Sequence, residues 1–241
     1  MPYEYLRRGV LAGVVAGLAY GSFVAFVANP FGEYLRHARH DHVHEHARGV
    51  SETTAAVVSV GSGVLWAIFL GGVFALALYV LEPALPGRGT ASAFVLAGAG
   101  FLTVSVTPWL VLPPAAPGAE QLYGVETRLA IYAGLVALGA VVSAVAIVTY
   151  AYAAPRHPAL GVVAGGVPIV TVAIVLPWLT PTIVTHPGLP GELVSAYRGM
   201  VVLSQAAIWA TLAAAVGWLQ RRDRAPDTAE SNERFAASPH R

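Results

Sequence analysis

The chain of 241 residues contains no cysteine and no lysine, because all 14 of its basic residues are arginine. Without cysteine there is no disulfide, no thiolate metal ligand and no thiol nucleophile. Without lysine there is no Walker A loop, so any ATP-driven step requires a partner. Two methionines are too few for a sulfur relay of Cu(I). A net charge of +1 without a long basic stripe gives no indication of nucleic-acid binding.

Charged residues of either sign are also scarce, at 11% against 56% hydrophobic residues. An average soluble domain has about a quarter charged residues. A soluble fold with so few charges would expose large apolar patches and aggregate. The mean hydropathy of +0.63 agrees. The composition therefore predicts an integral protein of the cell membrane, surrounded by the lipid bilayer.

Six charge-free stretches are long enough to cross a hydrocarbon core of about 30 Å as helices. Trimmed at prolines and polar residues, they predict spans at 9–28, 55–81, 91–112, 129–152, 159–180 and 198–219. The predicted fold class is all-α, a polytopic integral membrane protein with about six transmembrane helices in three hairpins. In this interpretation Asn29-Pro30 closes the first helix, and Pro168 and Pro177 interrupt the fifth.

The same pattern divides the chain into two parts. Residues 1–220 form the transmembrane domain, with a His-rich extracytoplasmic loop at 33–52. Residues 221–241 are polar, mixed in charge and contain two prolines, which is typical of a disordered cytoplasmic tail.

Arginine placement predicts that both termini are cytoplasmic, because cytoplasmic loops carry an excess of positive residues. With both termini on one side of the membrane, that side holds nine arginines and the opposite side five. The nine are Arg7, Arg8, Arg88, Arg156, Arg221, Arg222, Arg224, Arg234 and Arg241, and the five are Arg36, Arg39, Arg48, Arg128 and Arg198.

The strongest local signal is a tract of five histidines within ten residues, on the side assigned as extracytoplasmic. The tract contains His37, His40, His42, His44 and His46, together with Asp41 and Glu45. Neutral imidazole suits Co(II), Ni(II) and Zn(II), and carboxylates can complete the shell. Whether the segment is extended or helical, at least two histidines share a face. We predict a metal-capturing loop; a solvated loop whose histidines merely titrate is the alternative.

Two further groups of residues are candidates for an ion path. Pro108 frees a backbone carbonyl one turn earlier in the third helix, next to Thr107, and Pro177 interrupts the fifth helix. Such polar groups are tolerated at membrane depth only where they face protein or a wet cavity, so both helices are candidate pore walls; ordinary proline kinks are the alternative. Candidate mouth residues, for which solvated loop positions are the alternative, are Glu120, Glu126, His186 and Glu192.

Two other sequence patterns concern helix packing and internal symmetry rather than metal binding. Glycines at steps of four lie on one face of the first helix and predict close helix packing, within the chain or with a partner; they are Gly9, Gly13, Gly17 and Gly21. The third and fifth helices each run into a Pro/Gly-rich loop, an acidic residue and then an arginine that opens the next helix. These pairs are Glu126 with Arg128, and Glu192 with Arg198. Weak internal symmetry of this kind is common in transporters, although chance similarity explains it as well.

These features together resemble the CbtA family, the predicted cobalt transporter subunit of prokaryotes, over about residues 1–220. The matching segments are Val27-Ala28-Asn29-Pro30, the histidine tract, Leu81-Glu82-Pro83, Thr107-Pro108-Trp109-Leu110-Val111-Leu112-Pro113-Pro114, and Tyr197-Arg198-Gly199 leading to Gln205. The resemblance implies cobalt uptake linked to cobalamin synthesis, with a small single-helix CbtB-type subunit as partner. A homo-oligomer is an open alternative.

The sequence contains no motif of a hydrolase, zinc protease or paired-carboxylate enzyme, so we do not expect an enzyme or a tightly bound cofactor. The prediction is a subunit of a divalent-metal importer that carries Co(II), with Ni(II) and Zn(II) as other cargo that the tract accommodates. The alternative is a membrane metal sensor or assembly subunit that does not transport.

Overall fold

The computed structural model describes residues 2–38, 52–180 and 183–236. In these ranges six helices are long and apolar enough to cross a membrane, as the sequence predicted. The helical elements are α1 (Pro2–Phe23), η1 (Val24–Ala28), α2 (Asn29–Ala38), α3 (Glu52–Leu81), η3 (Glu82–Ala84), α4 (Thr90–Phe101), η4 (Leu102–Val106), α5 (Thr107–Trp109), α6 (Val125–Ala153), α7 (Pro158–Leu179) and α8 (Gly191–Ala236). Two short strands, β1 (Glu120–Gln121) and β2 (Val184–Thr185), lie in the connecting segments.

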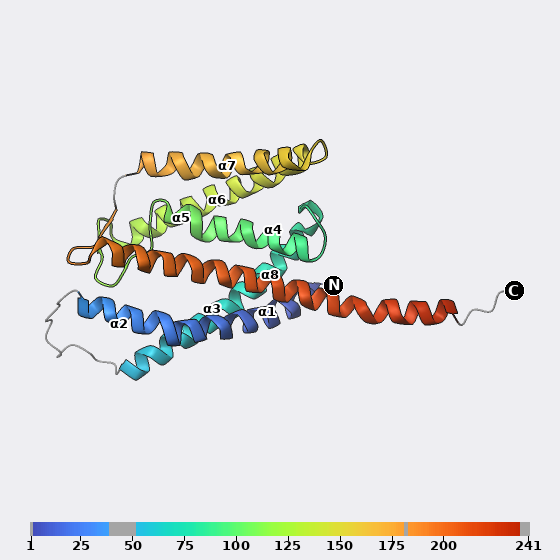
Figure 1. Cartoon of the computed structure of the whole chain (residues 1–241), viewed down its shortest axis with the longest axis horizontal. Coiled ribbons are helices and arrows are strands. Elements are labelled where there is room, and N and C mark those ends of the chain that lie inside the picture. The colour runs from blue at the N-terminus through green and yellow to red at the C-terminus, as the bar shows by residue number, and fades with distance from the viewer. Residues whose placement is uncertain (1, 39–51, 181–182, 237–241) are drawn as a thin grey trace.

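Successive spans run in opposite directions along the long axis of the molecule (Figure 1). The start of α1, the α3–α4 connection and the α6–α7 connection lie toward one end, which we call the termini end. The end of α2, both strands, and the starts of α6 and α8 lie at the other, which we call the strand end. The His-rich tract therefore begins at the same end as the strands.

The first two spans cross at the glycine face of α1. A methyl group on Gly13 would lie 2.8 Å from the carbonyl oxygen of Ala67 in α3, and one on Gly17 would lie 3.0 Å from that of Val64. Such distances are too short for a Cβ, so only glycine lets the two backbones approach this closely. Gly9 faces the backbone of Gly71 in the same way, whereas Gly21 faces the side chain of Val64. The four glycines thus pack α1 against α3 within the chain.

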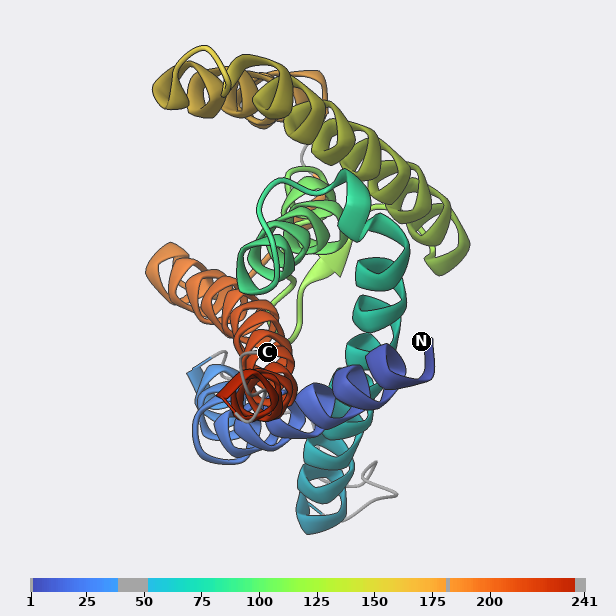
Figure 2. The same ribbon diagram turned by 90° about the vertical axis from the view of Figure 1, so that its right-hand side faces the viewer.

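Helix α8 connects the two halves of the bundle, because it packs against both α1 and α4. Its Trp209 and Leu212 are buried in the main hydrophobic core, together with Phe74 and Leu78 of α3. The Trp209 ring also lies against Gly100 of α4. Figure 2 shows α8 lying between the α1–α3 pair and α4.

Helix α7 is peripheral and packs mainly against α6. Gly165 of α7 faces the carbonyl of Ala146 in α6, while Trp178 and Leu179 are among the most exposed apolar side chains. In Figure 2 the α6–α7 pair curves away from the rest of the molecule. Most of the surface of α7 is therefore open to lipid or to another membrane helix.

Two spans contain a π-helical turn that ends immediately before an X-Pro pair. In η1 the N–H of Asn29 bonds the carbonyl of Val24, and Pro30 follows. In η4 the N–H of Thr107 bonds the carbonyl of Leu102, and Pro108 follows. A π turn is a known way to insert one residue into a helix without ending it.

The first span consequently continues through Pro30 to Ala38, so the prediction that Asn29-Pro30 closes it is wrong. The predicted interruption of the fifth span is also wrong, since α7 runs unbroken through Pro168 and Pro177. The π turn of the third span therefore has its counterpart in the first span and not in the fifth. Helix α8 continues to Ala236, past the predicted boundary at 220. The assignment of 221–241 as a separate disordered tail stays a prediction.

Candidate functional site

At the strand end, the loop after α5 and the loop after α7 are joined into one structure. Strand β1 pairs antiparallel with β2, with Gln121 opposite Val184, and the N–H of Leu122 donates to the carbonyl of Ile183 at 3.0 Å. Beneath the strands, Ile183 and Val184 pack with Leu135 of α6 in a small apolar cluster. The two predicted mouth loops therefore form a single cap over this part of the bundle.

His186 fastens this cap. Its Nε2 lies 3.1 Å from the backbone N of Ala116, and an amide N–H can only donate, so Nε2 accepts. Burial, and secondly the positive charge of Arg198, lower the pKa of His186 and favour the neutral ring. The proton of that neutral ring then sits on Nδ1. Neither nitrogen presents a free lone pair, so His186 would have to release Ala116 before it could bind a metal.

The three predicted mouth carboxylates do not converge with His186 on a metal-binding geometry. Glu120 is exposed on β1, while Glu126 and Glu192 are exposed in the first turns of α6 and α8. Acidic side chains at these positions are stabilised by the positive end of the helix dipole. Among the residues that the structure describes, no three His, Asp or Glu side chains are grouped for a metal ion. A role of the carboxylates in attracting cations stays a prediction.

His37 presents its ring differently. It lies near the end of α2, exposed, with Nδ1 2.9 Å from the carbonyl oxygen of Glu33. A carbonyl can only accept, so Nδ1 carries a proton, and in the neutral tautomer the lone pair lies on Nε2. This is the arrangement in which metal-ligating histidines are usually held. The rest of the predicted ligand set lies outside the described residues; it comprises His40, Asp41, His42, His44, Glu45 and His46.

A polar seam runs between η4 and α6, within the predicted third span. The hydroxyls of Thr103 and Ser143 lie 3.1 Å apart, and Ser143 also donates to the carbonyl of Ala99 at 3.2 Å. Tyr132 donates to the carbonyl of Val104 at 3.0 Å. In a regular helix that carbonyl would bond the N–H four residues later, which is Pro108 and has none. Tyr132 thus satisfies the carbonyl that proline frees.

Thr107 and Pro108 end the seam and are fully buried. Within the described ranges the Thr107 hydroxyl has no hydrogen-bond partner, and it faces Gly139 of α6. Pro177, the third predicted wall residue, is exposed on α7 instead. The structure therefore places Thr107 and Pro108 in the interior and Pro177 on the surface. Sequence reasoning missed Tyr132 and Ser143, whose roles depend on contacts with another helix.

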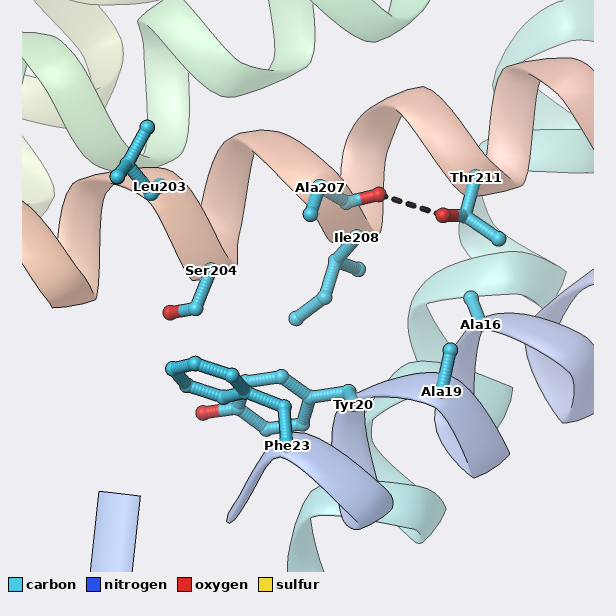
Figure 3. A pocket seen from close by; sticks show the side chains of 9 residues that line it. All are labelled: Ala16, Ala19, Tyr20, Phe23, Leu203, Ser204, Ala207, Ile208 and Thr211. Carbon is cyan, nitrogen blue, oxygen red and sulfur yellow. Dashed lines mark hydrogen bonds between the residues drawn. The ribbon is translucent and has the colours of Figure 1, made fainter. Parts of the chain in front are cut away.

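A cavity of about 280 Å³ lies between α1 and α8 (Figure 3). Its hydroxyls are already engaged: Ser204 donates to the carbonyl of Val201 at 2.9 Å and Thr211 to that of Ala207 at 2.7 Å. The Gln205 amide interacts with the hydroxyl of Tyr20, across the two helices. The remaining walls are apolar and include Phe23, so the cavity offers few oxygen atoms to a divalent cation.

At the termini end, two polar contacts tie α1 to the chain that surrounds it. The Tyr5 hydroxyl donates to Glu82 at 2.5 Å, and Arg8 pairs with Asp223 of α8 at 2.8 Å. Glu82 follows α3 directly, so the first contact holds the ends of α1 and α3 together. Both contacts close the bundle at the end opposite the strands.

A family model described as "Probable cobalt transporter subunit (CbtA)" matches residues 3–221. The matched range includes all six spans, both π turns and the histidine tract. No curated protein and no solved structure shows significant similarity to the chain.

Proposed function

Since the chain belongs to the CbtA family of probable cobalt transporter subunits, we propose that it is the membrane-embedded subunit of a Co(II) importer. The family match over nine-tenths of the chain carries this proposal. The six spans agree with it, because moving a hydrated divalent ion through a bilayer requires a polytopic protein.

The histidine tract supports import as the direction. It begins in the last turn of α2, which extends the first span by ten residues, or about 15 Å of helix, toward the strand end. The arginine distribution favours an extracytoplasmic location for that end. A loop that binds Co(II) weakly at an outer mouth would raise the local concentration of the ion. His37 is suited to act as one ligand, because its Nδ1 is held by the Glu33 carbonyl and its Nε2 has no hydrogen-bond partner among the described residues.

The seam between η4 and α6 is the best candidate for the wall of the ion path. It combines three hydroxyls with a backbone carbonyl at membrane depth, and the Thr107 hydroxyl has no partner in the described part of the chain. Hydroxyl and carbonyl oxygens can replace some of the water around a divalent ion. Because these oxygens carry no net charge, they hold the ion less tightly than carboxylates would. Weak ligands allow release as well as entry.

We propose that the partner is a small single-helix subunit that docks between α4 and α7. A groove of about 770 Å³ opens there, lined almost wholly by apolar side chains. Gly98 of α4 and Gly166 of α7 line it, and neither would place a methyl group within 4 Å of another atom. Small residues that face open space allow another helix to approach closely. The word subunit in the description of the family supports the existence of such a partner.

The alternative function is a membrane metal sensor or assembly factor. Reconstitution into liposomes that contain a Co(II)-quenched dye separates the two. A transporter accelerates quenching above empty liposomes, alone or with its partner subunit, whereas a sensor binds Co(II) without accelerating its entry. A Thr107→Val variant tests the seam, because it replaces the hydroxyl that has no partner in the described residues with a methyl group of similar size; we expect slower flux at equal protein content.

A further inference from the structure

Arg128 has an unbalanced positive charge. It is only partly exposed, and its Nη1 donates to the side-chain oxygen of Gln121 on β1. In the described ranges the ion pairs are those of Arg8 with Glu4 and Asp223, so no carboxylate neutralises Arg128. Its Nε is buried and has no hydrogen-bond partner there. A guanidinium offers five donors, and among the described residues the one side-chain acceptor bonded to Arg128 is Gln121.

Arg128 lines a pocket of about 300 Å³ at the strand-end start of α6. Gln121 and Tyr132 add polar atoms to the pocket, and the remaining walls are apolar, with Leu112 and Leu129 among them. The pocket therefore has one positively charged wall, and its other walls are mainly apolar. This combination suits a molecule with an anionic group attached to hydrocarbon.

The depth of Arg128 matches the headgroup layer of the membrane. Helix α6 has 29 residues, which at 1.5 Å each is about 43 Å, against a hydrocarbon core of about 30 Å. About four residues at each end therefore lie in the headgroup region. Arg128 is the fourth residue of α6, so its side chain reaches the level of lipid phosphates.

We propose that this pocket binds a phospholipid of the leaflet at the strand end, with the headgroup phosphate on Arg128 and the acyl glycerol against Leu112 and Leu129. An arginine fork matches the geometry of phosphate oxygens and holds them with two charge-assisted hydrogen bonds. The bound phosphate would also neutralise a positive charge beside the proposed cation entrance. The proposal does not depend on transport, because lipid binding is measured separately.

The test compares three additives on the full-length protein in an uncharged detergent: phosphatidylglycerol, diacylglycerol with the same chains, and inorganic phosphate. Thermal unfolding is followed by size-exclusion chromatography, and lipid adducts are counted by native mass spectrometry. We expect phosphatidylglycerol alone to raise Tm and to form a one-to-one adduct. Arg128→Gln should weaken that adduct about tenfold, which is typical for the loss of charge-assisted hydrogen bonds.

Two further variants keep the result decisive. Arg156→Gln removes an exposed arginine at the other end of α6, whose guanidinium stacks on Tyr152, and should leave the adduct unchanged. Leu129→Trp fills the pocket while keeping Arg128, so it should weaken the adduct even if Arg128→Gln folds poorly. An equal effect of diacylglycerol or of inorganic phosphate, or full binding in both pocket variants, would overturn the proposal.

Discussion

The hydroxyl of Tyr132 donates a hydrogen bond of 3.0 Å to the backbone carbonyl of Val104. The two residues belong to different spans, and the bond exists because Pro108 cannot supply an N–H to that carbonyl. In the hydrocarbon core of a bilayer, no water is present to donate a hydrogen bond to an unsatisfied carbonyl. Tyr132 therefore satisfies the carbonyl that Pro108 leaves without a donor in the third span.

A double-mutant cycle tests this relationship. We expect Tyr132→Phe to lower the free energy of unfolding by about 1 kcal/mol, because it leaves the Val104 carbonyl without a donor. In a Pro108→Ala background the new N–H reaches that carbonyl, so the same change should cost much less. SDS titration in mixed micelles measures both values. Equal costs in the two backgrounds would show that Tyr132 does not compensate for Pro108.

The crossing of α1 and α3 depends on glycine. Gly13→Ala would place a methyl group 2.8 Å from the carbonyl oxygen of Ala67, so the helices must separate. We expect a loss of about 1–3 kcal/mol, as for other overpacked sites. Gly134→Ala on α6 is the matched control, since nothing lies within 4 Å of its added methyl group. It should stabilise α6 by about 0.5–1 kcal/mol. Comparable losses of stability in both variants would contradict the close contact of α1 with α3 at Gly13.

Acid should open the cap at the strand end. The pKa of His186 in the folded protein lies below the value of about 6.5 in the unfolded chain, so the unfolded chain binds more protons below that pH. The stabilising contribution of the neutral ring is thus lost as pH falls through the folded pKa. A protonated Nε2 cannot accept the N–H of Ala116. We expect hydrogen exchange of the Ala116 amide to lose protection in this range, relative to the hydrogen-bonded amide of Ala154.

The control for the cap is His186→Gln, which cannot titrate. In this variant the relative protection of Ala116 should no longer change between neutral and mildly acidic pH. A pH response that persists without the imidazole would assign it to another group.

Filling the groove between α4 and α7 should weaken the association with the partner subunit. Gly166→Leu adds a side chain where the structure has open space, so the chain should still fold. We expect its co-purification with the single-helix partner to fall several-fold. Gly134→Leu, which is also open but lies outside the groove, should have no such effect. Unchanged co-purification in Gly166→Leu would place the partner elsewhere.

The sequence predicted the six spans because the membrane imposes a length and an apolar composition on each of them. It did not predict the course of the chain at Asn29-Pro30. The same dipeptide pattern ends many helices, and only the preceding π turn, Val24–Ala28, shows that this helix continues. Pro168 and Pro177 gave the same error, because α7 also continues through both prolines without a break.

The sequence located the histidines of the candidate site but could not predict what each imidazole ring binds. A histidine in a sequence carries no information about which ring nitrogen is free. The structure shows that His186 uses Nε2 to hold Ala116, whereas His37 uses Nδ1 to bond the carbonyl of Glu33. Tyr132 could not be identified beforehand either, because its partner carbonyl lies 28 residues away on another span.

The most direct test of the central claim is the cobalt content of cells that express the chain with its single-helix partner. Elemental analysis would compare the wild type with a variant in which all five tract histidines, His37, His40, His42, His44 and His46, are changed to alanine. Import with capture predicts raised cobalt in the wild type, and a deficit in the variant that is largest at low external cobalt. No accumulation in either, with both proteins present in the membrane, would contradict import and favour the sensor or assembly function.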